Sequence, residues 1–436
     1  MTLKIVLSVV LLSAVAAFGQ QAQETTAVAT TNNLLSLNEV VSEVLSNNPS
    51  LKSARANWEA MKQRIPQAKA WEDLRFGVDV ERSKKISPFS YTDQEWMILQ
   101  ELPVTGKNRL RGKAASAEAA GAFLDVRRKE LDLIVRARTA YFRLFNADKQ
   151  LELNRKNQAL WKQFAEIARA KFEVGSQTQA DVLMAETELG KIAETIFDDL
   201  RNISDAQSQL NVLMNRPAQS PLPTPTQVNP PELNSALEEL QQISLANRPD
   251  ITIFQTKIDA AKARLDLAKK AWFPDPEVRI EARHFDNSNK VFDEYDTGVF
   301  IRFPWFNRGK YKAAIEEAKK MQESSEHDLA SAQNETLGMV REQLKKVETF
   351  HHHSELFGSK LIPLARETLN SKRLNYETDK ANFLDLLTAQ RTLQEVESMY
   401  WNHLTDYQIA VAELEALVGG KINFQNPTIE KTQEKK

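Results

Sequence analysis

The sequence contains no cysteine and only 13 glycines among its 436 residues. Without a thiol the chain can form no disulfide, no thiolate metal site, no cysteine nucleophile and no lipid anchor on an N-terminal cysteine. Glycine stands at less than half of its usual frequency, which argues against a loop-rich all-β protein. The formal net charge is −2, so the charge balance predicts no nucleic-acid partner.

Long apolar runs are also scarce. One mainly apolar run of 13 residues, 5–17, follows Lys4 and leads into small residues up to Gly19. It is too short to cross about 30 Å of hydrocarbon as a helix. Its layout is that of a secretory signal peptide, which we predict for residues 1–19; the alternative is a buried N-terminal helix. An exported chain without a longer apolar run either stays soluble or meets a membrane as β-strands.

The sequence repeats itself once along its length. An offset of 200 residues aligns Leu37 with Leu237 and Pro49 with Pro249, and an offset of 204 aligns residues 181–183 with 385–387. Such self-similarity predicts two copies of one structural unit. The predicted domains are a signal peptide at 1–19, a disordered segment at 20–34, a first repeat at 35–215, a proline-rich linker at 216–231, a second repeat at 232–420 and a polar tail at 421–436.

Each half is predicted to contain long helices. Residues 106–172 include no proline, and their counterpart 309–376 is interrupted by Pro363. A second helix in each half carries apolar residues at a seven-residue period, which is typical of a coiled-coil seam. The rungs are 182, 189, 196, 203 and 210 with 185, 192, 199, 206 and 213, and the same positions 204 residues later. Asp199 and His403 interrupt these rungs at equivalent places, either as a contact between the halves or as partly exposed seam positions.

Four segments alternate apolar and polar residues with a period of two, which predicts strands. They form one hairpin in each half, at 72–83 with 92–103 and at 275–285 with 297–305. A tilted strand of about 9–11 residues crosses a bilayer, but four strands leave open edges at a cost of several kcal/mol for each unpaired group. Either the hairpins pack on a soluble helical body, or several chains pool their strands.

At this level of detail the sequence resembles the TolC-type outer-membrane efflux proteins. The matching motifs are Phe-Glu-Val-Gly at 172–175 with Asp-Val-Leu-Met-Ala at 181–185, and their counterparts at 376–377 and 383–389. The Leu-Pro-Val-Thr-Gly-Lys segment at 102–107 resembles the heavy-metal efflux branch. The resemblance covers about residues 35–420, and the doubled order of elements is more specific than any single motif.

The resemblance implies a mainly α protein with a transmembrane β-barrel part, built as a homotrimer. Three chains would supply a 12-stranded barrel in outer-membrane lipid and a periplasmic α-helical barrel below it. The expected partners are a periplasmic adaptor protein and an inner-membrane transporter. The expected function is passive conduction of substrates to the outside, with heavy-metal cations favoured and drugs or other small molecules as the alternative.

The resemblance also assigns candidate sites near the periplasmic tips. The candidate adaptor-docking residues are Val174, Gly175, Ser176, Thr378, Asp379 and Lys380. The candidate constriction residues are Asp385, Thr388 and Asp181. Thr378-Asp379 stands where the family often has Val-Gly, and Thr388 stands where its archetype has a second acidic residue. The alternative role for Asp181 and Asp385 is that of a carboxylate favoured by a helix start.

No enzyme motif occurs in the sequence, and we expect no catalytic activity and no cofactor. The run His351-His352-His353 is the other conspicuous cluster. Neighbouring residues on a helix do not share a face, so a solvated surface is favoured over a weak metal contact. A secreted coiled-coil scaffold and a periplasmic adaptor subunit remain as alternatives to a channel.

Overall fold

The computed structural model of the protein describes residues 34–81, 93–227, 235–285, 288–378 and 380–420. The predicted signal peptide, the polar tail, Asp379 and all but Leu34 of the predicted disordered segment lie outside these residues. The boundaries of the predicted domains stay predictions.

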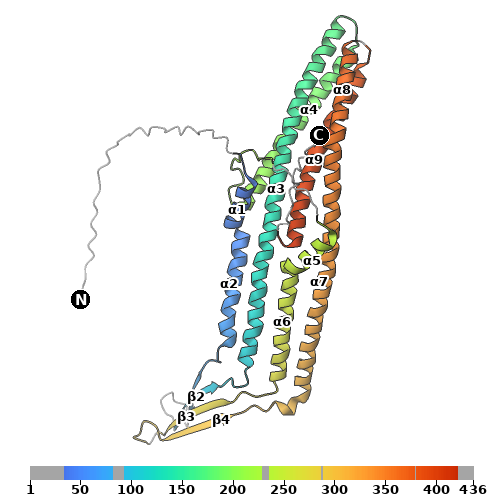
Figure 1. The fold of residues 1–436 in the computed structure, drawn as a ribbon. Coiled ribbons are helices and arrows are strands. Elements are labelled where there is room, and N and C mark those ends of the chain that lie inside the picture. Colours follow the sequence, from blue (N-terminus) through green and yellow to red (C-terminus); the bar gives the residue numbers. More distant parts are fainter. Residues whose placement is uncertain (1–33, 82–92, 228–234, 286–287, 379, 421–436) are drawn as a thin grey trace, which may run out of the picture.

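The molecule is elongated, with its strands at one end and, at the other, the two turns that connect α3 to α4 and α8 to α9 (Figure 1). The first half runs α1 Leu37–Asn47, α2 Pro49–Lys69, β1 Arg75–Glu81, β2 Asp93–Glu101, α3 Lys107–Glu173 and α4 Gln179–Leu213. The second half runs α5 Leu237–Asn247, α6 Pro249–Lys270, β3 Glu277–Phe285, β4 Glu294–Phe300, the 3₁₀-helix η1 Pro304–Asn307, α7 Arg308–Leu356, the π-helix η2 Phe357–Leu361, α8 Ile362–Glu377 and α9 Phe383–Val418. The element order is thus repeated, as the sequence predicts.

The repeated prolines separate a short helix from a longer one in each half. Pro49 and Pro249 each begin a helix, a position at which the missing N–H costs nothing and the fixed φ is already helical. In the first half the side chain of Asn48 also accepts a hydrogen bond from the Ser50 N–H at 2.9 Å. These residues set the bends between α1 and α2 and between α5 and α6.

Helix α3 is the long axis of the fold. Its 67 residues correspond to about 100 Å of helix. It contacts α1, α2 and α4 of its own half and α6 and α9 of the other half. Midway along α3, the Tyr141 hydroxyl lies 2.8 Å from the carbonyl oxygens of both Leu35 and Thr226, which fastens the described part of the linker to the helix.

The predicted break at Pro363 takes the form of a π-helix just before the proline. The Ile362 N–H bonds to the Phe357 carbonyl, five residues back, and α8 then begins with Pro363 in its first turn. Proline cannot donate to the residue four positions earlier, and its ring crowds that carbonyl. The wider π turn relieves this conflict while the chain stays helical.

The strands form one antiparallel sheet in the order β1-β2-β3-β4. Strand β2 pairs with β3 across the two halves, and Ile98 lies opposite Ile280. Apolar side chains such as Phe76, Val78 and Ile98 are exposed on one face. The alternate residues are mostly charged and include an ion pair between Arg283 and Glu95 at 3.2 Å. The predicted period-two alternation is confirmed.

The prediction for the last strand was wrong in its bounds. It was expected at 297–305, whereas β4 ends at Phe300 and Pro304 opens η1. The apolar alternation continues past Phe300, but a proline has no N–H for a sheet hydrogen bond and turns the chain toward α7 instead. Among the helices that the structure describes, none combines the length and apolar character that crossing a membrane requires.

The segment at 102–107 forms a joint between the halves. Gly106 has a φ of 77°, which lets the chain turn from β2 into α3. The Thr105 N–H and hydroxyl donate to one Asp275 oxygen at 2.9 and 2.7 Å, and the Lys107 ammonium lies 3.0 Å from the other. Burial works to raise the pKa of Asp275, but these contacts with Thr105 and Lys107 hold it below its usual value.

Candidate constriction and docking site

The two turns assigned to adaptor docking lie together at the end of the molecule opposite the sheet (Figure 1). In the turn between α3 and α4, the Ser176 N–H donates to the Lys171 carbonyl and the Gly175 N–H donates to the Phe172 carbonyl, both at 2.9 Å. Gly175 has a φ of 76°. This is the Schellman motif, in which a left-handed residue ends the helix and satisfies its last carbonyls.

The turn between α8 and α9 closes in the same way, although its sequence departs from Val-Gly. The Lys380 N–H donates to the Asn375 carbonyl at 2.7 Å, which is the bond equivalent to that of Ser176. Thr378 takes the position of Val174, and Asp379, in the position of Gly175, lies outside the described residues. The departure in sequence therefore leaves the overall turn closure intact.

The candidate docking residues that the structure describes are all exposed. Val174 is 79% exposed, and Gly175, Ser176, Thr378 and Lys380 are exposed beside it. Leu183, Leu374 and Leu384 add exposed apolar side chains close to the same turns, and sequence reasoning missed them. Leu183 and Leu384 do not belong to the seven-residue apolar rungs. An apolar residue outside the buried seam is expected to be exposed, and this signal could have identified both.

Asp385 sits in the first turn of α9 and already has a partner. Its backbone N–H donates to the Asn382 side-chain oxygen at 2.9 Å. Its carboxylate lies 3.3 Å from the Lys372 ammonium on α8, and both side chains are partly exposed. Asp385 therefore has the exposure that a constriction residue needs, but a cation beside it offsets part of its charge.

Asp181 occupies the equivalent helix start on α4 in a different environment. It is only 8% exposed, and one carboxylate oxygen lies 3.2 Å from the Thr178 N–H and 3.1 Å from the Thr178 hydroxyl. This capping box satisfies the open start of α4. The contacts account for Asp181 as a helix-start carboxylate. Thr388 is exposed on α9, where its hydroxyl donates to the Leu384 carbonyl at 2.8 Å.

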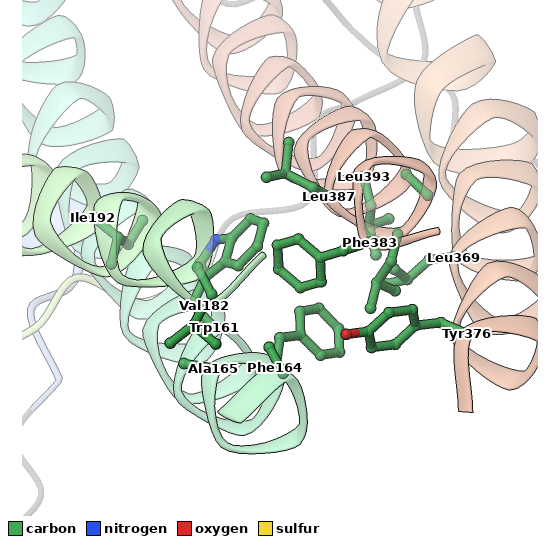
Figure 2. Close-up of a cluster of buried hydrophobic side chains, with 14 of the residues drawn as sticks. Trp161, Phe164, Ala165, Val182, Ile192, Leu369, Tyr376, Phe383, Leu387 and Leu393 are labelled. Carbon is green, nitrogen blue, oxygen red and sulfur yellow. The ribbon is translucent and has the colours of Figure 1, made fainter. Parts of the chain in front are cut away.

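A buried aromatic cluster lies just behind the turns and joins the two helical hairpins, the first formed by α3 and α4 and the second by α8 and α9. It combines Trp161 and Phe164 from α3, Tyr376 from α8 and Phe383 from α9, and their rings point toward one another in Figure 2. The Tyr376 and Phe383 rings meet edge to face at 5.6 Å. The Lys171 ammonium lies 5.2 Å from the Tyr376 ring centre. Apolar burial of this kind is the main force holding the tip in its present form.

An ion pair between the hairpins was missed from the sequence. The Arg391 guanidinium on α9 binds the nearly buried Glu188 carboxylate on α4, and the Lys191 ammonium lies 2.9 Å from the same group. The hydrogen bonds from Arg391 hold the pKa of Glu188 below its usual value despite burial, and they raise that of Arg391. No local motif marks a pair separated by 203 residues.

A row of amide side chains follows the contact between α3 and α9. Asn146 donates to Asn402 at 2.9 Å, and the Gln390 amide donates to Asn157 at 3.0 Å. The pairs Gln150 with Ser398 and Asn154 with Gln394 lie between them. Polar residues at three- or four-residue spacing on both helices were the available signal. Only the Gln390–Asn157 pair is buried, and a buried amide pair of this kind can fix helix register.

Asp199 and His403 do not contact each other across the halves, so that interpretation was wrong. Asp199 is buried and accepts a hydrogen bond from Asn154 at 2.7 Å, and burial raises its pKa. His403 is half-buried against His353 of α7, and burial lowers its pKa. His403 is thus the partly exposed seam position that the sequence allowed, whereas Asp199 is a buried one. The described residues hold no group of three or more His, Asp or Glu arranged to bind a metal ion.

Comparison with known proteins gives consistent matches over both halves. A family model described as outer membrane efflux protein matches residues 40–216 and 240–420. The cobalt-zinc-cadmium resistance protein CzcC of Cupriavidus metallidurans is 23% identical, over 88% of this chain and 90% of the relative. The toluene efflux pump outer membrane protein TtgF of Pseudomonas putida is 22% identical, over 89% of this chain and 84% of the relative.

Solved structures share the fold at low sequence identity. CusC, a transmembrane channel by its description, superposes with a TM-score of 0.79 at 19% identity, over 88% of this chain and 92% of CusC. The outer membrane protein VceC of Vibrio cholerae superposes with a TM-score of 0.74 at 18% identity, over 88% of this chain and 96% of VceC. The expected combination of long helices with a small β part is confirmed.

Proposed function

The chain belongs to the outer membrane efflux protein family, and from that membership we propose that it conducts its cargo passively and closes at the helical tip described above. Membership confirms the resemblance, the outer-membrane location with a periplasmic helical part, and the role as outer-membrane component of an efflux pump. The expected homotrimer, periplasmic adaptor and inner-membrane transporter are those of this family.

The closed state of the tip rests on contacts between the two hairpins. The Glu188–Arg391 pair and the aromatic cluster both join the first hairpin to the second within one chain. Conduction requires these hairpins to move apart, and an adaptor bound at the turns can favour the open state by contacting it better than the closed one. Val174, Gly175, Ser176, Thr378, Asp379 and Lys380 are the proposed docking residues.

Asp385 is the proposed constriction residue, with Thr388 one helical turn beyond it. In a trimer, three copies of Asp385 would surround one axis and attract cations, while Lys372 reduces their net charge. Asp181 is withdrawn into its capping box and contributes to this field only indirectly. The single observation that carries this assignment is the partial exposure of Asp385 at the start of α9.

Single-channel recording in planar bilayers tests the constriction. Asp385→Asn removes the charge with little change of shape, so we expect lower cation selectivity and a changed conductance. Asp181→Asn is the matched control, since it alters an equivalent helix start that is buried. If Asp385→Asn conducts with unchanged conductance and selectivity, Asp385 is not part of the constriction.

Heavy-metal cations are the proposed cargo. Support comes from the name of the relative CzcC and from the resemblance of residues 102–107 to the metal branch. The hydrogen bonds of Thr105 and Lys107 to Asp275 give that segment a structural role, so it carries less weight for cargo. Because TtgF is named for toluene, a deletion strain should be challenged with zinc, cadmium and cobalt salts and with solvents and dyes. Sensitivity to solvents alone would reverse the assignment.

We propose no catalytic activity for the chain, because its sequence has no enzyme motif. The sequence alone also allowed a secreted scaffold, which the family match disfavours. Fractionation separates the two: a channel sediments with outer membranes and resists extraction by salt, whereas a scaffold does not. Trimers that dissociate only on heating would add support.

A further inference from the structure

Two features of the sequence that the channel function does not use meet in the structure. One is the histidine run on α7, and the other is His403, which interrupts the apolar rungs of α9. The rings of His353 and His403 lie in contact, with their centres 4.8 Å apart. Phe357 covers the His403 ring from the first position of η2 at 5.0 Å.

Each of the two rings has an unsatisfied nitrogen. The Nδ1 atoms of His353 and His403 are buried and have no hydrogen-bond partner. Nearly all buried polar atoms in folded proteins are paired with protein, water or an ion. Two such atoms on adjacent rings from different helices are therefore available to coordinate a shared ligand.

We propose that His353 and His403 form a two-histidine site for a divalent transition-metal ion of the zinc, nickel or copper class. Imidazole nitrogens suit these ions, and a neutral ring presents one lone pair for coordination. Binding through both Nδ1 atoms leaves each Nε2 as the N–H donor. The ion has two protein ligands and completes its shell with water, consistent with the lack of a larger ligand cluster in the described parts of the chain.

The neighbouring residues separate this site from the rest of the histidine run. His352 is exposed, and its ring centre lies 6.4 Å from that of His353. His351 packs instead on Tyr407 at 5.2 Å. Asp406 follows His403 by three residues and so shares its side of α9, where it supplies negative charge. The site thus uses one histidine of the run and one from another helix.

The position of the site gives an ion a structural consequence. His353 precedes η2 by four residues, and His403 belongs to the helix that packs on it. An ion held by both would link α7 to α9 close to the point where α7 passes into the π-helix η2. The site depends only on this contact and not on the identity of the cargo.

Zinc titration of the full-length trimer in detergent, after removal of metals with a chelator, tests the site. We expect one zinc ion per chain and binding that is weaker by roughly tenfold or more in H353Q and in H403Q. H352Q is the matched control, because it removes an exposed neighbouring imidazole, and it should bind zinc as the parent does. Saturating zinc should raise the unfolding temperature of the parent and H352Q only.

Two results would overturn the proposal. One is zinc binding by H353Q and H403Q that equals the parent, and the other is an equal loss in all three variants, which would mean surface binding by the run. If either glutamine variant misfolds, the double variant H353C/H403C keeps the test decisive. In a chain without natural cysteine it should bind cadmium through two thiolates, and failure to do so contradicts the geometry.

Discussion

Arg391 on α9 donates two hydrogen bonds to the Glu188 carboxylate on α4, at 2.6 Å from Nη2 to Oε1 and at 3.2 Å from Nε to Oε2. The two residues come from different halves of the duplicated chain, and Glu188 is almost fully buried. A bidentate pair of this kind fixes the relative rotation of two helices as well as their distance. It is therefore suited to hold the tip closed.

Removing the Glu188–Arg391 ion pair should favour an open state of the tip. Glu188→Gln leaves Arg391 without its carboxylate and should cost about 1.5–3 kcal/mol, the range for hydrogen bonds to charged groups. We expect more frequent openings in planar bilayers. Glu186→Gln is the control, because Glu186 pairs with Arg169 inside one hairpin on an exposed surface. Equal effects of the two variants would mean that the pair between hairpins has no special role.

Gly175 should be the more sensitive of two exposed glycines in the first hairpin. Gly175→Ala places a side chain at a φ of 76° and should destabilise the turn by about 1–2 kcal/mol. Gly190 lies in open space within α4, so Gly190→Ala should instead stabilise the helix by up to about 1 kcal/mol. Thermal unfolding measures both changes, and the expected signs are opposite. A stabilising Gly175→Ala would contradict the turn geometry.

The aromatic cluster should account for much of the cohesion between the hairpins. Phe383 is fully buried in it, whereas its neighbour Leu384 is exposed. Phe383→Ala should cost about 3–5 kcal/mol, while Leu384→Ala should be nearly neutral. Amide hydrogen exchange at the tip reports the local loss directly. Unchanged protection in Phe383→Ala would show that other contacts hold the hairpins.

Asp199 should make the stability of the protein depend on pH. Burial raises its pKa in the folded state. The folded state is therefore stabilised by protonation of Asp199, and this stabilisation is complete below the unfolded pKa of about 3.9. That contribution is lost as pH rises through the higher folded value. Asp199→Asn should therefore be more stable than the parent at neutral pH and lose this advantage near pH 4. Unfolding temperatures across pH 4–8 measure the difference, and a constant difference would contradict the assignment.

Periodicity in the sequence was enough to predict the large elements. The seven-residue rungs predict α4 and α9, the proline-free stretch predicts α3, and period-two alternation predicts the hairpins. The end of β4 could not be predicted from alternation, since the apolar pattern continues to Trp305 although the strand ends at Phe300. Local pattern identifies an element more reliably than its last residue.

The site was less predictable because it depends on partners distant in sequence. Asp181 and Asp385 look equivalent by repeat, yet Thr178 buries the first in a cap while Lys372 pairs with the second. Nothing in the local sequence distinguishes Glu188 and Arg391 from other charged residues, because they become partners only when the two helical hairpins pack together. Residue type and spacing located the turns, and tertiary packing decided what each carboxylate contacts.

The pairing of β2 with β3 limits how such a chain could have arisen. A polypeptide with a single half would own two strands, and the edge that Ile98 occupies would lack its neighbour Ile280. It could make this four-stranded sheet only by associating with a second copy of itself. Six half-length subunits would then correspond to three full-length chains. In the full-length chain this contact is internal, and so are the bonds that join Asp275 of the second half to Thr105 and Lys107 of the first.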